Sequence, residues 1–595
     1  MTTVAPSLPA AFRESLGRRG DQPFIWAKAG GAYRPWSWRR VDRESRAVAA
    51  WLAAQGVAPG DRVVLVSENR PEWCIADLAI MRAGAVTVPA YTTNTAADHA
   101  YILNHSEARG VICSTPALKR TLMRAVAEAP TVKACLFVEE DGEAPPEALR
   151  TASWRAVVEA PDAHPAVDFT DRAGPGDLAC FIYTSGTSGH PKGVMLTHGN
   201  ILADVRGAVR LLEQIGLEDE VFLSFLPLSH AYEHTAGLWF PIVIGAQIYY
   251  AEGIEALATN LLEARPTILT CVPRLFEVMR QRIDRQIRRQ GGLRQRLFEE
   301  AIRLGRARYE QGRLGPLDRA LDRLLDPLVR RKVAARFGGR MKALVSGGAP
   351  LAYEVGIFFL ALGLPLLQGY GQTEASPVIS CNPPGRCRID TVGPPLEGVE
   401  VRIAEDGEIL VRGPIVMKGY WKDETATARV IRDGWLHTGD VGALDADGYL
   451  RITDRKKDII VNSGGDNISP QKVEGMLALQ PEIAQATVFG DRRPYLVALI
   501  VPDPEFAEGF AADHGLPAEP SLLIRDERFR RAIAAAVARA NARLAAIERV
   551  RRFDLLDGMF SIADGLLTPT LKIRRHLVHR RYRDRLEALY GDRAA

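Results

Sequence analysis

The sequence predicts an α/β protein: a large N-terminal domain of helix-covered sheets with a small β subdomain, followed by a small α/β C-terminal domain. Over about the first 450 residues, short apolar runs alternate with helical patterns, as in parallel sheets covered by helices. From Val392 to Leu450, glycine and proline punctuate short alternating runs, which predicts antiparallel strands and turns. A charged stretch, Asp454–Asp458, then precedes a smaller α/β segment. Because 595 residues exceed what one core supports, we expect domains at 1–454 and 455–595.

The N-terminal domain contains several apolar runs of strand length. They are Arg62–Ser67, Leu178–Thr184, Val221–Leu226 and Ala343–Ser346. Helical patterns follow several of them, as at Trp73–Ala83 and Ala203–Ile215. A buried strand followed by a helix is the unit from which parallel sheets are built, so these runs predict such sheets.

The longest uncharged stretch, Thr235–Ala251, has 17 residues and includes Pro241. A membrane-spanning helix needs about 18–20 apolar residues, so we predict a buried helix and strand instead. The N-terminus lacks the charged start and apolar run of a signal peptide. The seven cysteines occur singly, which argues for reduced thiols in the cytoplasm and against a disulfide framework or zinc site.

A basic region lies between Arg280 and Arg340, with 18 lysines and arginines against 7 acidic residues. Leucine and isoleucine recur there at helical spacing, so we predict amphipathic helices with a basic face. Two interpretations stay open: a solvated arginine-rich face, or a surface that meets anionic lipid or an anionic substrate. We expect no nucleic-acid partner, because no recognised module occurs and aromatic residues are sparse in this region.

The strongest local motif is Tyr183–Gly193, YTSGTSGHPKG. Its glycines permit close approach of the backbone, and successive N–H groups can wrap an anion. This predicts a polyphosphate-binding loop, which differs from the Walker pattern because glycine follows Lys192. A flexible surface loop is the alternative. The residues expected at the phosphates are Thr184, Ser185, Gly186, Thr187, Ser188, Gly189 and Lys192.

This loop resembles the phosphate-binding signature of the adenylate-forming enzymes: acyl-CoA synthetases, luciferases and peptide-synthetase adenylation modules. Further segments resemble motifs of that superfamily in the expected order: Leu226–His230 (LPLSH), Val345–Pro350 (VSGGAP), Gln368–Glu374 (QGYGQTE), Trp435–Asp440 (WLHTGD), Asp454–Pro470 (DRKKDIIVNSGGDNISP) and Leu567–Arg575 (LTPTLKIRR). The resemblance extends from about Arg62 to Arg575 and is closest to long-chain fatty acyl-CoA synthetases.

The resemblance implies sites for ATP, Mg²⁺, a fatty acid and coenzyme A. Adenine and ribose would contact Gly347, Gly348, Ala349, Gly369, Tyr370, Gly371, Asp440 and Arg455. Thr373 would join the loop at the phosphates. Glu374 and Thr184 would hold Mg²⁺, which prefers oxygen ligands. Lys572 would bridge the attacking carboxylate and the α-phosphorus, so Lys572, Glu374 and Thr184 are the catalytic residues that the resemblance implies.

Three further roles are implied by the resemblance. His230 would line the acyl pocket, although a core histidine satisfied by a backbone partner is the alternative. Gly464 and Gly465 would face coenzyme A. Lys457 would be the hinge about which the C-terminal domain rotates between the two steps, and an ordinary exposed lysine is the alternative.

The implied reaction converts ATP and a carboxylic acid to acyl-AMP and pyrophosphate, and then transfers the acyl group to coenzyme A. Motifs such as Val88–Thr95 (VPAYTTNT) and the basic helical insertion at about 280–340 favour a long-chain acid. A long chain needs an extended apolar tunnel. Its candidate lining, which ordinary core packing explains equally well, is Trp239, Phe240, Leu275 and Phe276. The alternative function is a fatty acyl-AMP ligase that hands the acyl group to a carrier protein.

Two other classes of function are alternatives. The segment HAYEH fits the zinc-peptidase pattern H-x-x-E-H through His230, Glu233 and His234, but it leaves the other motifs unexplained. A non-catalytic acyl- or nucleotide-binding relative is disfavoured because Lys572 and Glu374 are both present. We expect a cytoplasmic enzyme with a peripheral contact at the inner face of the membrane through its basic helices. The oligomeric state is open, with a homodimer as one candidate.

Overall fold

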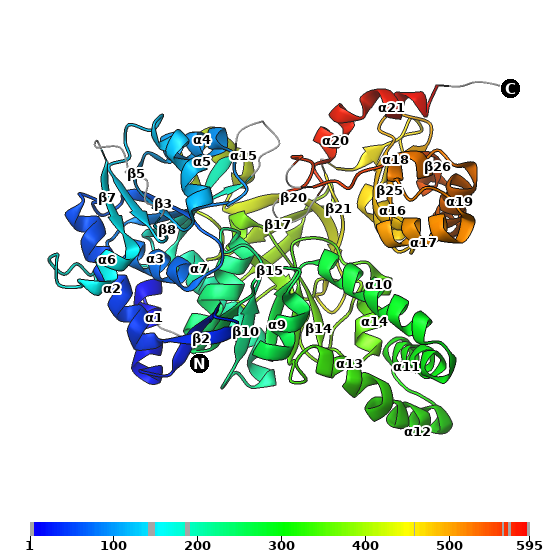
Figure 1. The fold of residues 1–595 in the computed structure, drawn as a ribbon, viewed down its shortest axis with the longest axis horizontal. Helices are drawn as coiled ribbons and strands as arrows, with labels where there is room; N and C mark the ends of the chain where they lie inside the picture. Colours follow the sequence, from blue (N-terminus) through cyan, green and yellow to red (C-terminus); the bar gives the residue numbers. More distant parts are fainter. Residues whose placement is uncertain are drawn as a thin grey trace.

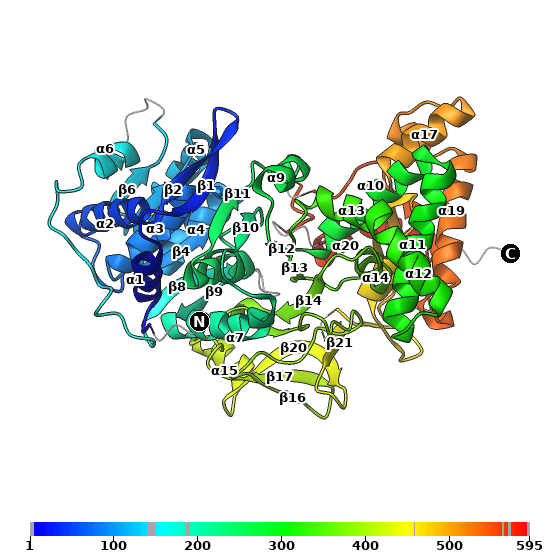
Figure 2. The same ribbon diagram turned by 90° about the horizontal axis from the view of Figure 1, so that it is seen from below.

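A computed structural model describes residues 5–140, 149–184, 191–456, 458–561, 564–568 and 573–591. Two large sheets form most of the N-terminal part, and a smaller antiparallel sheet lies beside them (Figures 1 and 2). A separate α/β unit contains the C-terminal residues. The predicted α/β class, with a β subdomain and a small C-terminal domain, is confirmed.

The first sheet has eight strands in the order β18-β9-β8-β4-β3-β5-β6-β7. Their bounds are β3 Arg62–Val66, β4 Val86–Ala90, β5 Ala108–Cys113, β6 Ala134–Phe137, β7 Arg150–Ser153, β8 Leu178–Thr184, β9 Lys192–Thr197 and β18 Gly419–Tyr420. Strands β3 to β8 run parallel. Strand β9 pairs antiparallel with β8, and β18 pairs antiparallel with β9. Along β3, Val63 and Leu65 enter one core while Val64 and Val66 enter another, so both faces are buried.

Helices cover both faces of this sheet. On one face lie α1 Leu8–Arg19, α2 Trp38–Ala54 and α3 Pro71–Arg82, and on the other lie α4 Ala96–Ser106 and α5 Pro116–Val126. The short α6 Trp154–Glu159 packs against α2. The core on the α1–α3 face continues into the second sheet, so the two sheets share one hydrophobic interior.

The second sheet has eight strands in the order β15-β14-β13-β12-β10-β11-β1-β2. Their bounds are β1 Pro23–Ala29, β2 Ala32–Ser37, β10 Val221–Ser224, β11 Gln247–Tyr250, β12 Ile268–Cys271, β13 Ala343–Ser346, β14 Leu366–Gly371 and β15 Val378–Cys381. All but the edge strands β2 and β15 run parallel. Its helices are α7 His198–Leu212, α8 Phe240–Ile244, α9 Leu257–Ala264, α10 Pro273–Gln290, α11 Gly292–Gln311, α12 Pro316–Leu325, α13 Arg331–Arg336 and α14 Tyr353–Ala361.

The β subdomain follows the second sheet. Its strands are β16 Glu400–Ile403, β17 Glu408–Arg412, β19 Ile431–Arg432, β20 Trp435–Leu444 and β21 Leu450–Arg455, with α15 Glu424–Val430 beside them. All of its pairings are antiparallel. The antiparallel strands predicted between Val392 and Leu450 are therefore confirmed.

The C-terminal unit has its own sheet, in the order β24-β25-β26. Its elements are β22 Ile460–Val461, β23 Asn467–Ile468, α16 Pro470–Ala478, β24 Ile483–Phe489, β25 Leu496–Pro502, α17 Pro504–His514, α18 Pro520–Leu523, α19 Glu527–Asn541, β26 Val550–Leu555, α20 Arg575–Arg581 and α21 Arg583–Ala588. Two core clusters in this unit share no buried residue with the N-terminal cores.

The sequence located several elements closely. The runs Leu178–Thr184 and Ala343–Ser346 coincide with β8 and β13. The stretch Thr235–Ala251 is a buried helix and strand, as predicted, but it begins in a π-helix, η2 Glu233–Trp239, that its pattern did not indicate. Within the described ranges, no helix is long and apolar enough to cross a membrane.

The predicted basic amphipathic helices are α10 to α13, with a second π-helical turn, η3 Asp326–Arg330, before α13. Part of their charge faces the C-terminal unit, which lies beside them (Figure 2). Arg285 pairs with Asp503 at 3.4 Å and with Glu505, and Arg289 pairs with Glu505 at 2.5 Å. The arginine-rich face is therefore partly an intramolecular contact, which the sequence alone did not predict.

Candidate active site

Three predicted motifs meet at one edge of the second sheet. LPLSH follows β10, VSGGAP spans the end of β13, and QGYGQTE spans the end of β14. These strands are parallel, with β12 between β10 and β13. Because the carboxyl ends of parallel strands lie at the same edge, segments far apart in the sequence share one site.

The turn after β13 contains Gly347, Gly348 and Ala349, the first segment predicted for adenine. The Gly347 N–H donates to the Cys271 carbonyl oxygen at 3.0 Å. A Cβ on Gly347 would lie 3.1 Å from the ring of Tyr232, and Gly348 has φ +82°. Glycine is therefore favoured at both positions, for close packing at one and a left-handed backbone at the other. Ala349 is exposed.

Tyr370, Asp440 and Arg455 form a chain of hydrogen bonds between the second sheet and the β subdomain. The Tyr370 hydroxyl donates to Asp440 Oδ2 at 2.6 Å, and Arg455 Nε donates to Asp440 Oδ1 at 2.9 Å. Burial and the neighbouring Asp440 carboxylate raise the pKa of Tyr370 well above its ordinary value. Each Asp440 oxygen keeps a further lone pair with which a sugar hydroxyl can bond.

The two glycines that flank Tyr370 lie within β14. A Cβ on Gly371 would overlap the carbonyl oxygen of Pro377, and one on Gly369 would lie 3.3 Å from the Ser380 carbonyl oxygen. Gly371 therefore lets β14 turn tightly into the segment that carries Thr373 and Glu374. These two residues lie in the short helix η4, Thr373–Ala375, with Thr373 buried and Glu374 partly exposed.

Tyr420 connects two residues that the sequence assigned to the nucleotide. Its hydroxyl donates to Glu374 Oε1 at 2.8 Å, and its ring centre lies 4.8 Å from Lys192 Nζ. Lys192 begins β9 and pairs in register with Thr184 at the end of β8. Thr184 and Lys192 are therefore strand neighbours, and Tyr420 contacts both Lys192 and Glu374, although no motif indicated Tyr420.

The residues predicted to hold Mg²⁺ have suitable chemistry. Glu374 offers carboxylate oxygens and Thr184 a hydroxyl oxygen, and Mg²⁺ prefers such ligands. Within the described part of the chain, the Glu374 carboxylate has one hydrogen-bond partner, the Tyr420 hydroxyl, so it retains lone pairs for a cation.

The π-helix η2 holds two neighbouring strand ends together. The Glu233 carboxylate accepts hydrogen bonds from Ser224 of β10 at 2.6 Å and from Thr270 of β12 at 2.7 Å. Complete burial raises the pKa of Glu233 to about 7, against the effect of these two donors. A Cβ on Gly237 would overlap the Glu233 carboxylate, so glycine at that position gives the carboxylate its space.

The residues on either side of Glu233 reach two other parts of the site. Tyr232 donates its hydroxyl to the Val345 carbonyl oxygen at 2.8 Å, next to the adenine turn. Thr235 donates to the Ser376 carbonyl oxygen at 2.9 Å, directly after η4. Sequence reasoning missed both residues, although the HAYEH segment that contains Tyr232 had been singled out as a zinc pattern.

The HAYEH segment does not form a zinc site. His234 turns away from Glu233, and its Nε2 lies 3.0 Å from Asp77 Oδ2 in the core. His230 is half-buried, and its Nδ1 accepts the Tyr232 N–H at 3.1 Å, as a histidine with a backbone partner would. Among the residues with assigned positions, no group of three or more histidine, cysteine or acidic side chains could hold a metal.

Other predicted residues lie away from this edge. Gly464 and Gly465 form an exposed turn between β22 and β23, where Gly465 has φ +85°. The candidate tunnel residues divide between two cores: Trp239 and Phe240 lie in one, Leu275 and Phe276 in another. This division favours ordinary core packing. The remaining predicted site residues lie outside the described residues: Ser185, Gly186, Thr187, Ser188, Gly189, Lys457 and Lys572.

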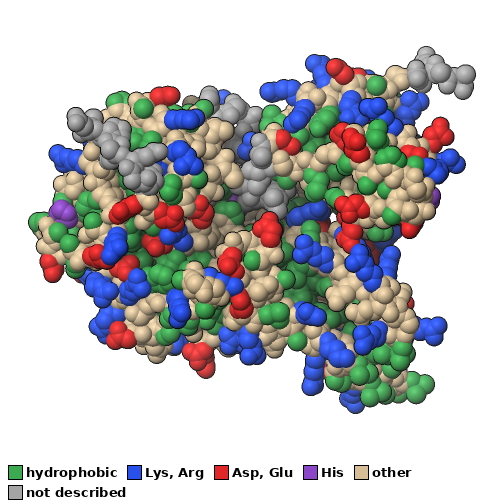
Figure 3. Space-filling view, viewed as in Figure 1, with side chains coloured by type: hydrophobic (Ala, Val, Ile, Leu, Met, Phe, Trp, Pro, Cys, Tyr) green, Lys and Arg blue, Asp and Glu red, His purple; other side chains and the backbone are tan. Residues whose placement is uncertain are grey.

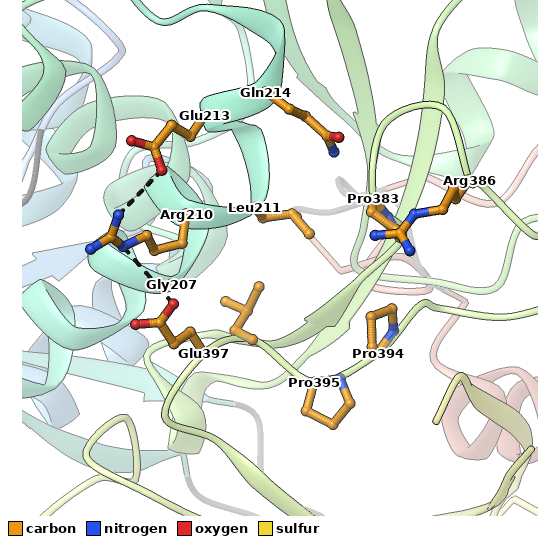
Figure 4. A pocket seen from close by; sticks show the side chains of 11 residues that line it. Gly207, Arg210, Leu211, Glu213, Gln214, Pro383, Arg386, Pro394, Pro395 and Glu397 are labelled. Carbon is orange, nitrogen blue, oxygen red and sulfur yellow. Dashed lines mark hydrogen bonds and ion pairs between the residues drawn. The ribbon is translucent and has the colours of Figure 1, made fainter. Parts of the chain in front are cut away.

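A hollow of about 530 Å³ lies between α7 and the segment 383–397 (Figure 4). Pro394 and Pro395 line one side, with Pro383 and Arg386 above them in this view. Arg210 on the opposite side is already paired with Glu213 at 3.2 Å and lies 3.9 Å from Glu397. No predicted site residue lines this hollow, so it is separate from the candidate active site.

Comparison with known families gives two matches. Residues 12–421, more than half of the chain, match the family described as AMP-binding enzyme. Residues 457–594 match the AMP-binding enzyme C-terminal domain.

Curated relatives match over most of their length. The long-chain-fatty-acid–CoA ligase FadD15 of Mycobacterium tuberculosis is 37% identical over 558 residues, which cover 92% of this chain and 90% of the relative. The long-chain-fatty-acid–CoA ligase 6 of Mus musculus is 31% identical and covers 98% of this chain, with 87% of its own length matched.

Among solved structures, the adenylation domain of a carboxylate reductase from Mycobacterium chelonae superposes with a TM-score of 0.79 at 24% identity, covering 99% of this chain and 92% of that one. The corresponding domain from Segniliparus rugosus, in complex with AMP and a carboxylic acid, has a TM-score of 0.78 at 23% identity and covers 100% and 95%. These structural similarities show that the chain shares the fold of these adenylation domains.

Proposed function

The chain belongs to the AMP-binding, adenylate-forming enzyme family, and on that premise we propose that it is a long-chain fatty acid–CoA ligase. A fatty acid carboxylate attacks the α-phosphorus of ATP and releases pyrophosphate. The thiol of coenzyme A then attacks the acyl-AMP and releases AMP. The observation that carries the proposal is the sequence identity, 37% and 31% over nearly the full length of the chain, with relatives named as long-chain-fatty-acid–CoA ligases.

In the proposed site, the nucleotide occupies the carboxyl edge of the second sheet. The Tyr370 ring and the turn at Gly347 face adenine, and Asp440, held by Arg455, accepts hydrogen bonds from the ribose hydroxyls. Lys192 and the loop before it neutralise the phosphates. Positioned donors and positive charge are what an in-line attack between two anions requires.

Mg²⁺ bound with ATP would neutralise phosphate charge, and Glu374 and Thr184 would hold it. Tyr420 donates to Glu374 and so fixes the direction of its carboxylate. Lys572 contributes a positive charge between the attacking carboxylate and the phosphate.

The second step uses the other face of the C-terminal unit. Gly464 and Gly465 admit coenzyme A, and the unit rotates about Lys457 between the steps. His230 lies at the acyl pocket. We place the enzyme in the cytoplasm with a peripheral contact to the inner face of the membrane, and a homodimer is one candidate for its assembly.

The test is product analysis with ATP, Mg²⁺, coenzyme A and acids from acetate to stearate. We expect AMP, pyrophosphate and long-chain acyl-CoA, with adenylation abolished in Lys572→Ala. AMP formation with only short or aromatic acids would overturn the substrate assignment. Acyl-AMP without a thioester would identify a carrier-protein ligase, and adenylation of no acid would refute the proposal.

A further inference from the structure

Helix α4 contacts the chain on either side of the central part of the predicted phosphate-binding loop. The Tyr101 hydroxyl donates to the Pro191 carbonyl oxygen at 3.0 Å, directly before β9. His105 Nδ1 lies 2.8 Å from the hydroxyl oxygen of Tyr183, the second-last residue of β8. Because Tyr101 and His105 are four positions apart, they lie on one side of the helix, and their rings stack at 5.2 Å. We call these two residues the α4 pair.

The hydrogen bond between Tyr183 and His105 joins two neutral groups. Burial raises the pKa of the Tyr183 hydroxyl well above its ordinary value, so the hydroxyl keeps its proton. Burial and the neighbouring Lys422 lower the pKa of His105, so its imidazole is neutral at pH 7. With the ring proton on Nε2, Nδ1 accepts from the hydroxyl. The contact therefore requires an acceptor at position 105, which an asparagine oxygen would also supply.

The backbone is held by hydrogen bonds on both sides of Lys192. Before this residue, the Pro191 carbonyl oxygen accepts from α4. After it, the Gly193 carbonyl oxygen accepts the Trp421 N–H at 2.8 Å. Trp421 Nε1 in turn donates to the His105 carbonyl oxygen at 3.0 Å, so the two supports are connected to each other.

Helix α4 is itself fixed at both ends, although it lies at the outer surface with basic side chains beside it (Figures 1 and 3). At its start, the Asp98 N–H donates to Thr95 Oγ1 at 3.2 Å, and the Thr95 N–H donates to Asp98 Oδ2 at 2.9 Å. At its end, Arg62 Nε of β3 donates to the Ser106 carbonyl oxygen at 2.6 Å. A helix held in this way can fix the positions of the groups that its side chains contact.

We propose that Tyr101 and His105 are positioning residues for ATP, which hold Tyr183 and the backbone of Lys192 on either side of the phosphate-binding segment. A segment whose ends are fixed has fewer conformations to lose when it binds a ligand, so its ordering costs less free energy. The α4 pair acts through other residues, and its effect should appear in the binding of ATP rather than of the acid. This inference rests on the proposed function, because it takes ATP as the ligand of the loop.

The test is the Kd for MgATP without fatty acid, measured by isothermal titration calorimetry for Tyr101→Phe/His105→Leu. The matched control is Tyr33→Phe, since the Tyr33 hydroxyl also donates to a backbone carbonyl, that of Tyr250 at 3.1 Å, from the edge strand β2. We expect the double variant to bind ATP at least about tenfold more weakly, because two hydrogen bonds are lost. The control should bind ATP as the unaltered protein does.

Two further readouts separate positioning from a general stabilising role. Initial rates of the double variant should show a raised KM for ATP, with the KM for the fatty acid changed by less than about twofold. His105→Asn, which keeps an acceptor, should retain the ATP affinity of the unaltered protein to within about threefold, whereas His105→Leu should not.

Equal ATP affinity of the double variant and the control would overturn the proposal. So would a parallel rise of both KM values with a lower unfolding temperature, which would show that the α4 pair only stabilises the fold. Equal losses in His105→Asn and His105→Leu would overturn the role given to the hydrogen bond of His105. Absence of ATP binding by the unaltered protein would refute the proposed function itself, and because that measurement involves no variant, the two failures are distinguishable.

Discussion

At the scale of single residues, Tyr420 shows how a side chain outside every motif can organise the site. Its hydroxyl donates to Glu374, and its ring lies against Lys192. A hydrogen bond to a charged acceptor contributes about 1.5–3 kcal/mol. This bond also fixes the direction in which the Glu374 carboxylate points.

We predict that Tyr420→Phe lowers kcat/KM for ATP by about tenfold, because the ring remains while the hydrogen bond to Glu374 is lost. The loss should be greatest at low Mg²⁺. Initial rates over a range of Mg²⁺ concentrations measure it. Tyr449→Phe is the matched control, since it also removes a buried tyrosine's hydrogen bond, to Arg386, away from the site. Equal rates for both variants at every Mg²⁺ concentration would contradict the prediction.

Glu233 should make the stability of the N-terminal domain depend on pH. Its pKa rises from 4.5 to about 7 on folding because burial disfavours the charged form. The folded protein thus binds this proton more tightly than the unfolded chain does. The stability that this provides is complete below about pH 4.5 and is lost as the pH rises through about 7.

We predict that Glu233→Gln removes this dependence. Between about pH 5 and 7, the free energy of unfolding of the unaltered protein should fall relative to that of the variant, by at most on the order of 3 kcal/mol. Urea unfolding at several pH values measures the difference. Parallel pH curves for the two proteins would show that Glu233 is not the titrating group.

The candidate site residues that the sequence predicted lie in short motifs. Tyr370, Asp440 and Arg455 were assigned by resemblance to motifs, and the structure brings them into one hydrogen-bonded chain. Tyr232 and Tyr420 could not be found in this way, because their partners lie more than 40 positions away and depend on how the strands assemble.

At the scale of elements, the helical insertion contacts the C-terminal unit, which its excess of basic residues alone did not indicate. Arginines on α10 pair with α17 and with its capping residue, while α12 turns its basic flank outward. The strands were predictable because burial on both faces leaves continuous apolar runs. The π-helix η2 was not predictable, because six of its seven residues are buried, so the segment has no amphipathic period that an extra residue could shift.

We predict that Arg285→Glu/Arg289→Glu weakens the contact between the C-terminal unit and α10, because three attractive ion pairs with Asp503 and Glu505 become repulsive. Exposed pairs contribute about 0.2–1 kcal/mol each, so the shift should be several-fold in population. Small-angle X-ray scattering should show a larger maximum dimension. Arg282→Glu/Arg288→Glu, with the same change in charge, should leave it unaltered.

Rescue provides the sharper control. Adding Glu505→Arg to the double variant should restore most of the compact scattering profile, since two of the three ion pairs are then exchanged while Asp503 stays acidic. A profile that stays extended would show that α10 and α17 are not held by these charges.

At the scale of the whole molecule, the N-terminal sheets share one interior, and the C-terminal unit has its own. Separate cores unfold as separate cooperative units when few contacts join them. We therefore predict two calorimetric transitions, of which ATP raises mainly the one assigned to the N-terminal domain. A single transition, with calorimetric and van't Hoff enthalpies equal, would show that the two parts unfold together.

The π-helix η2 limits which deletions the chain tolerates. Four consecutive residues, from Tyr232 to Thr235, contact four different parts of the fold, and the last three lie in η2, which contains about one residue more per turn than an α-helix. Deleting a single residue within Glu233–Trp239 would restore ordinary helical spacing and rotate these side chains away from their partners. In this segment the number of residues is constrained as strictly as their identity, so deletions should be rejected where many substitutions are accepted.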